Sequence, residues 1–160
     1  MHTWLPSSNY DSIPNFLDDV RLCKQRFDCL RIFRALSDPS YGFQTHPVVR
    51  MWRGYEKNLF NYSCEICNGY LQRINSKTSD ECLNEIEQIE IDGLTFGKAE
   101  KDWYSLVNSE WNKKHGSRPP WYSCEHIFSS HRAALLAKNP KWYTQFNWTE
   151  EPKIRYFWPV

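Results

Sequence analysis

The sequence lacks any apolar run that could cross a membrane. No stretch approaches the ~18–20 consecutive apolar residues of a spanning helix. Residues 1–10 also lack the apolar core of a secretory signal peptide. Without such a signal, we expect the six cysteines to be reduced, mostly buried thiols. These absences predict an intracellular protein, in the cytoplasm or the nucleus, with no membrane partner.

The chain also lacks the short motifs of several large enzyme classes. It has no P-loop, no GxSxG, no HExxH and no GxGxxG. Cys64 and Cys67 form one CxxC pair, but no second pair follows at the spacing of a zinc site, so we expect no metal and no other cofactor. The groups left for chemistry are Arg, His and carboxylate side chains on predicted helices, together with the N-terminal amine.

Negative charge is scarce outside one segment. Residues 78–92 hold six acidic residues and no Lys or Arg. The whole chain has 19 acidic and 20 basic residues, so outside this segment 13 acidic residues remain against 20 basic ones, a net charge of +7. A basic body favours a polyanionic partner. The eight tryptophans fit stacking on nucleobases as well, although core packing is the commoner role of any single Trp.

One long helix is predicted over Asn15–Leu36, and the rest of the domain is organised around it. Apolar residues recur there at steps of three and four in two stripes, so we expect burial on two sides. The first stripe comprises Phe16, Val20, Cys23, Phe27, Leu30 and Phe33, and the second comprises Leu22, Cys29, Ile32 and Leu36. Between them runs a polar line of Asp18, Arg21, Gln25 and Asp28. Buried charge is costly unless it is paired or faces a ligand, so the line is either a satisfied network or a site.

A second long helix is predicted from His46-Pro47 to Tyr70. Its periodic apolar residues are Val48, Trp52, Tyr55, Leu59, Tyr62, Ile66 and Tyr70. Two long helices that cross at the core predict an all-α fold. The length of 160 residues is that of one compact domain, residues 1–160.

Residues 73–118 are predicted to be a variable insertion that includes the acidic segment. Asp80–Ile91 is expected to form a short helix that ends at a turn of Asp92-Gly93. Lys98–Lys114 is expected to form another helix. Its predicted inward residues are Trp103, Leu106, Val107 and Trp111.

The remaining C-terminal part is predicted to cover the bundle. Ser123 is expected to cap a helix that runs to about Lys138. The tail that follows is aromatic and basic without a helical period, so we expect it to wrap over the other helices.

Four blocks of the sequence carry a resemblance to a known family. They are LDDVRLCKQRFD (residues 17–28), THPVVRMWRGYE (45–56), SSHRAALLAKNPKWY (129–143) and the terminal YFWP (156–159). These blocks resemble the pyrimidine dimer DNA glycosylase family, the endonuclease V-like enzymes, and most closely its bacterial and viral branch. The resemblance covers about two-thirds of the chain, and residues 73–118 lie outside it.

The resemblance implies an endonuclease V-like, all-helical DNA-repair enzyme that binds damaged double-stranded DNA and displaces a base from the stack. It implies glycosylase and AP-lyase activity on pyrimidine dimers or related lesions. The N-terminal amine attacks the sugar, and the resulting Schiff base permits β-elimination. An α-amine has an ordinary pKa of about 7.7–8.0, so a useful fraction is neutral near pH 7. A nearby carboxylate stabilises positive charge that develops on the sugar.

The resemblance also assigns roles to residues of this sequence. The expected catalytic residues are Met1 through its amine, Asp18 or Asp28 as the electrostatic partner, and Arg21 and Gln25 at the sugar-phosphate. The residues expected to hold phosphates are Lys24, Arg26, Arg50, Arg53 and Arg132, and those expected against the backbone or an opened base are Trp142 and Tyr143. His46 and His131 are further nucleic-acid-binding candidates, unless each simply satisfies a helix end.

Two positions differ from the family pattern. The type enzyme exposes an N-terminal threonine, whereas His2 here predicts that Met1 is retained. Its catalytic Glu directly follows the first helical Arg, whereas Leu22 follows Arg21. Both differences favour an alternative in which the chain is a non-catalytic nucleic-acid-binding or structural protein on the same scaffold, for instance a viral protein packaged in a virion. A hydrolase of small nucleotides is a third hypothesis, supported only by the Arg, His and Asp residues.

Overall fold

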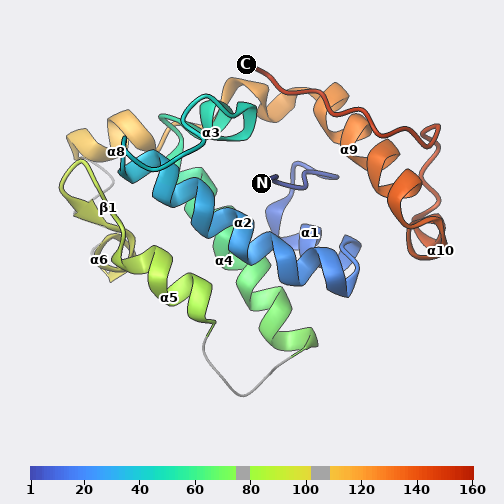
Figure 1. Cartoon of the computed structure of the whole chain (residues 1–160), viewed down its shortest axis with the longest axis horizontal. Coiled ribbons are helices and arrows are strands. Elements are labelled where there is room, and N and C mark those ends of the chain that lie inside the picture. The colour runs from blue at the N-terminus through green and yellow to red at the C-terminus, as the bar shows by residue number, and fades with distance from the viewer. Residues whose placement is uncertain (75–79, 102–108) are drawn as a thin grey trace.

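The computed structural model describes residues 1–74, 80–101 and 109–160, which fold as helices around a long central one, α2 (Figure 1). The α-helices are α1 (Ile13–Phe16), α2 (Asp19–Ser37), α3 (Pro47–Trp52), α4 (Glu56–Arg73), α5 (Glu81–Gln88), α6 (Phe96–Lys101), α8 (Glu110–His115), α9 (Glu125–Lys138) and α10 (Pro140–Tyr143). Short 3-10 helices are η1 (Tyr10–Ser12), η2 (Pro120–Ser123) and η3 (Thr144–Phe146), and an antiparallel ribbon pairs β1 (Glu90–Ile91) with β2 (Leu94–Thr95). The prediction of an all-α, single compact domain is confirmed. Within the described residues, no helix is long and apolar enough to span a bilayer.

The helix predicted over Asn15–Leu36 is wrong in its N-terminal part, where the structure has two helices. α1 ends at Phe16, and Leu17 and Asp18 are extended, with ψ of 136° and 162°. Asp18 caps α2, because its side chain accepts a hydrogen bond from Arg21 N at 2.9 Å. An aspartate at this position satisfies a free N–H group of the first turn, which favours starting a new helix there.

The helix predicted from His46 to Tyr70 is also divided. α3 begins after His46, whose Nδ1 accepts a hydrogen bond from Val48 N at 3.2 Å. Beyond α3 the chain turns through Gly54, whose φ of +85° is a left-handed conformation that glycine adopts without a steric penalty. Glu56 accepts a hydrogen bond from Gly54 N at 2.8 Å, and α4 starts there. Two helices at an angle therefore replace the single predicted one.

α2 buries most of the second predicted apolar stripe, and it buries the first stripe only toward its C-terminal end, at Leu30 and Phe33. The second stripe is buried as expected at Leu22 and Ile32. In the first stripe, however, Val20 is 76% exposed and Phe27 is 38% exposed, so the prediction of burial is wrong at these positions. The polar line is largely buried instead, because the N-terminal segment covers it and hydrogen-bonds to Gln25.

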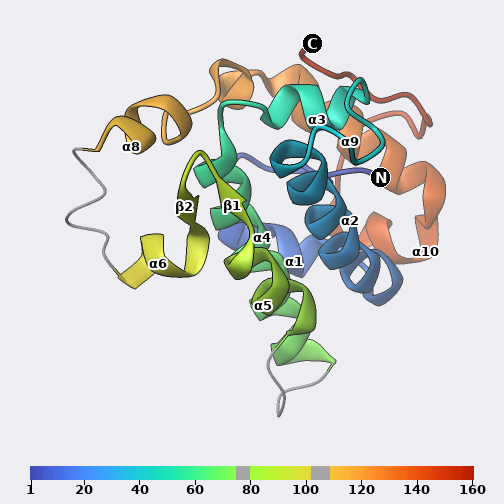
Figure 2. The same cartoon turned by 60° about the vertical axis from the view of Figure 1, so that its left-hand side comes forward.

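The described part of the predicted insertion packs beside α2 and α4, on the side that Figure 2 brings forward. α5 is shorter than the predicted helix Asp80–Ile91, because Asp80 is its N-cap and the chain pairs as β1 from Glu90. The predicted turn of Asp92-Gly93 is confirmed. Both residues have positive φ, and they join β1 to β2.

Only the two ends of the helix predicted over Lys98–Lys114 are described. α6 and α8 occupy these ends, and Trp111 is buried as expected. The other expected inward residues, Trp103, Leu106 and Val107, lie outside the described residues.

The C-terminal tail covers α9. This helix begins after Cys124, so the predicted cap at Ser123 is wrong, since Ser123 lies in η2. Residues 147–160 run back along α9 without regular structure, as the red trace in Figure 1 shows. Lys153 N donates a hydrogen bond to Ala133 O at 3.1 Å, which ties the tail to the helix. The prediction that the tail wraps over the bundle is confirmed.

Candidate functional site

The N-terminal segment lies over the middle of α2, where Figure 1 places the N-terminus beside this helix. Trp4 N donates a hydrogen bond to Gln25 Oε1 at 3.1 Å, and Gln25 Nε2 donates one to His2 O at 2.8 Å. Leu5 N donates a hydrogen bond to His131 Nδ1 on α9 at 2.9 Å. These bonds hold the first residues between α2 and α9, and they place the amine of Met1 over the polar line of α2.

A cavity of about 380 Å³ opens at this point. Its walls come from the N-terminal segment, α2, the last turn of α9 and the tail. The lining residues are Met1, His2, Trp4, Val20, Arg21, Lys24, Gln25, Asp28, Lys138 and Tyr156. Three cationic side chains and the amine therefore surround a single carboxylate.

Asp28 is the carboxylate beside the amine. Its Oδ1 lies 3.9 Å from Met1 N and 3.5 Å from Arg31 Nη1, and the side chain is 5% exposed. Burial raises the pKa of the Asp28 carboxyl, and the N-terminal ammonium, Lys24 and Arg31 only partly offset that rise. Among the described residues, no group donates a hydrogen bond to Oδ1. The groups that balance its negative charge are the amine of Met1 and the guanidinium of Arg31, both at ion-pair distance.

Asp18 is not among the lining residues of the cavity, although it belongs to the same polar line. Burial alone would raise the pKa of Asp18, but hydrogen bonds from Asn139 Nδ2 at 3.0 Å and from Arg21 outweigh burial and hold the pKa below its ordinary value. The ion pair with Arg21 fixes that guanidinium at the cavity wall. Of the two aspartates that the sequence left open, the structure brings Asp28 to the amine, and Asp18 orients Arg21.

Gln25 positions the N-terminal segment. Its amide oxygen accepts from Trp4 N, its amide nitrogen donates to His2 O, and its side chain is 1% exposed. Both ends of the amide are engaged by backbone groups. Gln25 therefore holds the N-terminal segment in place, and its expected contact with a sugar-phosphate stays a prediction.

Three of the expected phosphate ligands are exposed and face solvent. Lys24 lies on the cavity wall, and Arg50 lines a second groove of about 800 Å³ between α3, α9 and the tail. The two cavities meet at Tyr156, which lines both. Arg53 lies in the turn before Gly54, where its guanidinium donates a hydrogen bond to Gln44 at 2.9 Å. These cations extend the positive surface away from the amine.

Arg26 and Arg132 are both paired with carboxylates of the protein. Arg26 is 4% exposed, pairs with Asp80 Oδ2 at 2.6 Å, and lies 3.5 Å from the centre of the Tyr70 ring. Arg132 pairs with the exposed Glu125 and with Glu150, and it also donates a hydrogen bond to Pro6 O at 3.0 Å. The expected contacts of these two guanidinium groups with phosphates stay predictions, and each would have to compete with the ion pairs seen here.

His131, Trp142 and Tyr143 are held in structural contacts too. His131 is fully buried, and burial lowers its pKa to about 3, so it is neutral and accepts from Leu5 N. Tyr143 is also fully buried, and its hydroxyl accepts a hydrogen bond from Asp18 N at 3.2 Å. Trp142 Nε1 donates to Phe16 O at 2.8 Å. These hydrogen bonds connect α9 and α10 to the N-terminal segment, to α1 and to the start of α2, and the expected DNA contacts of the three residues stay predictions.

His46 lies near the amine without lining the cavity. Burial lowers the pKa of His46, the N-terminal ammonium lowers it further, and Asp28 raises it. Its Nδ1 caps α3. The sequence left open whether His46 is a site residue or a helix cap, and the structure identifies it as a cap within electrostatic reach of the site.

The sequence prediction missed the part of the cavity wall that comes from distant segments. Lys138 reaches the cavity from the last turn of α9, and Tyr156 reaches it from the tail. His2 packs its ring against the rings of Trp4 and His131, at centroid distances of 4.1 and 5.1 Å. No local pattern could have found Lys138 or Tyr156, because the packing of α9 brings Lys138 to the amine and the path of the tail over α9 brings Tyr156 there.

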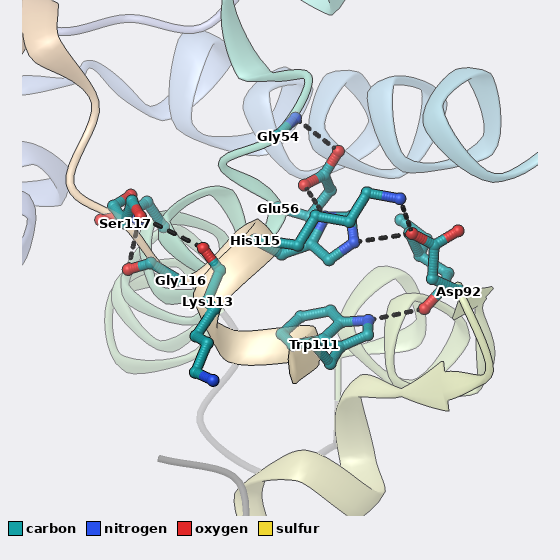
Figure 3. Close-up of polar contacts among 11 residues, drawn as sticks. Gly54, Glu56, Asp92, Trp111, Lys113, His115, Gly116 and Ser117 are labelled. Carbon is teal, nitrogen blue, oxygen red and sulfur yellow. Dashed lines mark hydrogen bonds and ion pairs between the residues drawn. The ribbon is translucent and has the colours of Figure 1, made fainter. Parts of the chain in front are cut away.

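A second cluster of buried ionisable residues joins the insertion to α4 (Figure 3). His115 Nδ1 contacts Glu56 Oε2, and His115 Nε2 lies 2.9 Å from Asp92 Oδ2. Asp92 also pairs with Lys114, and Glu56 Oε1 accepts from Gly54 N. Each polar atom of the His115 and Glu56 side chains has a partner within the protein. This cluster therefore docks α8 and the β1–β2 turn on α4.

A family model described as pyrimidine dimer DNA glycosylase matches residues 1–82, which contain α1 to α4 and the cavity residues from Met1 to Asp28. No curated protein and no solved structure matches the chain.

Proposed function

The chain belongs to the pyrimidine dimer DNA glycosylase family, and from this premise we propose that it excises a damaged pyrimidine and then nicks the strand, with the amine of Met1 as nucleophile. The observation that carries the proposal is the buried pair of Met1 N and Asp28 Oδ1, 3.9 Å apart in a cavity lined by cations. Double-stranded DNA is the proposed substrate.

In the proposed reaction, the amine nitrogen bonds to C1′ of the damaged nucleotide as the bond from C1′ to the base breaks. The base leaves with the electron pair of that bond and takes up the proton that the amine nitrogen loses. The bond from C1′ to the ring oxygen of the sugar then breaks, the oxygen takes up a proton from solvent, and an iminium ion forms. Water accepts the proton from C2′, a double bond forms between C2′ and C3′, and the 3′ phosphate leaves with the electron pair of its bond to C3′. Positive charge develops at C1′ and then on the imine nitrogen, so a fixed carboxylate beside these atoms lowers the barrier. In our proposal, Asp28 is this carboxylate.

The cations around the cavity supply the proposed binding surface for the strand. Arg21, Lys24 and Lys138 hold the phosphates that flank the displaced nucleotide, and Arg50 and Arg53 contact phosphates further away. Such contacts position the duplex without reading its sequence. Arg21 is paired with Asp18, and its Cζ lies 5.7 Å from the centre of the Tyr143 ring, so two contacts hold its position.

Borohydride trapping tests the chemistry directly. The protein is incubated with duplexes that carry either a cyclobutane dimer or an abasic site, and borohydride is added to reduce any Schiff base. We expect a covalent adduct that disappears when the N-terminus is acetylated and falls strongly in Asp28→Asn. The matched control is Asp11→Asn, since Asp11 is exposed and lies in η1. Mass measurement of the purified chain establishes which amine is present.

The alternative is a non-catalytic nucleic-acid-binding protein on the same scaffold. One observation favours it. The residue after Arg21 is Leu22, whose apolar side chain is fully buried, and no carboxylate stands at this position. Duplex binding without any trapped adduct would support this alternative and overturn the enzymatic proposal.

A further inference from the structure

The apolar face that α2 leaves exposed lies directly beside the amine cavity. Val20 and Phe27 belong to it, and Ile74 at the end of α4 is 43% exposed next to them. Together with Cys23 and Tyr70 these side chains line a shallow depression, which we call the α2 patch. Exposed apolar groups gathered in one place indicate a binding surface, whereas single exposed groups are common on any protein.

The α2 patch and the amine cavity form one continuous surface. Val20 and Lys24 line both. The charged residues at the patch are Lys24, Arg31 and Asp19, so cations outnumber the acid. Asp19 is also 3.4 Å from Arg73, which reduces its effect on an approaching anion. A polyanion long enough to extend beyond the cavity on this side therefore meets the patch.

We propose that the α2 patch packs against the base step next to the nucleotide that enters the cavity. This inference rests on the proposed function. When a nucleotide leaves the stack, the neighbouring base pairs lose their apolar contacts, and this costs a few kcal/mol. Apolar side chains that approach from the minor groove recover part of that contact, while flanking cations hold the phosphates. Val20 and Phe27 supply the apolar contact, and Lys24 and Arg31 supply the charge.

Charge argues for DNA rather than for a second copy of this chain. Two copies joined through the α2 patch would bring their own Lys24 and Arg31 side chains together, and like charges at an interface are unfavourable. DNA brings phosphates to the same positions. Because patch and cavity share Val20 and Lys24, one extended strand is able to contact both.

The test uses the double variant V20S/F27S and the matched control Ile154→Ser, whose side chain is 63% exposed in the tail. In a duplex with a reduced abasic analogue, a 2-aminopurine placed beside the analogue reports unstacking by its fluorescence. We expect wild type and Ile154→Ser to raise this fluorescence, and V20S/F27S to lose most of the rise. We also expect the ratio of trapping rates on duplex and on single-stranded abasic DNA to fall about tenfold in V20S/F27S, about 1.4 kcal/mol, because the single strand needs no unstacking.

The two proposals fail in different ways. An unchanged fluorescence rise and an unchanged ratio in V20S/F27S overturn the α2 patch proposal, even if wild type forms the adduct. Absence of any adduct with wild type overturns the glycosylase proposal, while loss of the fluorescence rise in V20S/F27S still supports the patch. Sedimentation gives a third outcome. A wild-type dimer that V20S/F27S converts to monomer identifies a second copy as the occupant and overturns the DNA contact.

Discussion

The two buried ionisable clusters of this protein look alike in composition and differ in completeness. The insertion cluster places His115 between Glu56 and Asp92, and each nitrogen of the ring has a carboxylate partner. At the amine cavity, Asp28 Oδ1 and His2 Nε2 have no hydrogen-bond partner among the described residues. Native proteins pair nearly all buried polar atoms, so an unpaired atom beside a cavity needs an explanation.

This difference shows that buried charge alone does not identify a site. Both clusters combine histidine, carboxylate and cation, and both lie on α2 or α4 of the same core. In the insertion cluster, the polar groups pair with one another and so join the insertion to α4. The amine cavity keeps a carboxylate, an amine and three cations beside open volume. The comparison predicts that mutations in the first change stability, whereas mutations in the second change chemistry.

The largest expected effect is on stability, from His115→Ala. Removing the ring leaves Glu56 buried without its partner, and breaking a buried pair costs about 3–5 kcal/mol. We expect the Tm in thermal unfolding to fall by about 10 °C. The control on the same helix is Lys113→Ala, whose ion pair with Glu110 is exposed, and it should leave Tm unchanged. A normal Tm combined with lost trapping in His115→Ala would contradict the comparison.

The next effect is on chemistry, from Asp28→Asn. Loss of one preorganised charged group in an active site lowers the rate by about 100-fold. We expect this loss in the rate of adduct formation, measured under single-turnover conditions, with no fall in Tm. Glu56→Gln serves as the comparison from the other cluster, and it should lower Tm while the folded protein keeps its trapping rate. If the two variants exchange these effects, the roles assigned to the clusters are reversed.

Gln25→Ala should affect both stability and chemistry. The change leaves Trp4 N and His2 O without partners, at a cost of about 1–3 kcal/mol. Because the amine is then less well held, we expect trapping to slow by about tenfold with little change in duplex affinity. Gln145→Ala is the control, since Gln145 is exposed and donates only to Trp142 O. A large loss of DNA affinity in Gln25→Ala would point to direct contact with the substrate.

The smallest effect distinguishes the two aspartates by the sign of their pH dependence. The pKa of Asp18 is lowered in the folded state, so its charge stabilises the fold above its unfolded pKa, and this stability is lost as pH falls through the folded pKa. The pKa of Asp28 is raised, so its charge destabilises the fold above that pKa, and protonation removes the cost as pH falls. In urea unfolding at pH 7, Asp18→Asn should be less stable than wild type and Asp28→Asn more stable. Both differences in the free energy of unfolding from wild type should shrink as pH falls toward 3. If both variants were more stable than wild type at pH 7, or both less stable, the opposite pKa shifts of Asp18 and Asp28 would be contradicted.

Much of the helical framework was predictable from local patterns. The apolar spacing identified the regions of α2 and α4, and Asp92-Gly93 identified the turn between β1 and β2. The breaks at Asp18 and Gly54 were missed, although each residue is a known helix-end signal, because the apolar period continues across both. Arg26 was expected to hold a phosphate because its partner within the protein could not be recognised. Its partner Asp80 is 54 residues away, and no local pattern reports such a pairing.

The sequence by itself determined that one side of a helix would carry Arg21, Gln25 and Asp28, because residues at these spacings share a helix face. Only the tertiary structure decided that Asp28 meets the amine, that Asp18 serves Arg21, and that Val20 and Phe27 stay exposed. The reason is that the path of the N-terminal segment depends on His131, which accepts from Leu5 N across 126 residues of sequence. Contacts of this range depend on how whole helices pack, and that packing is set by the entire core.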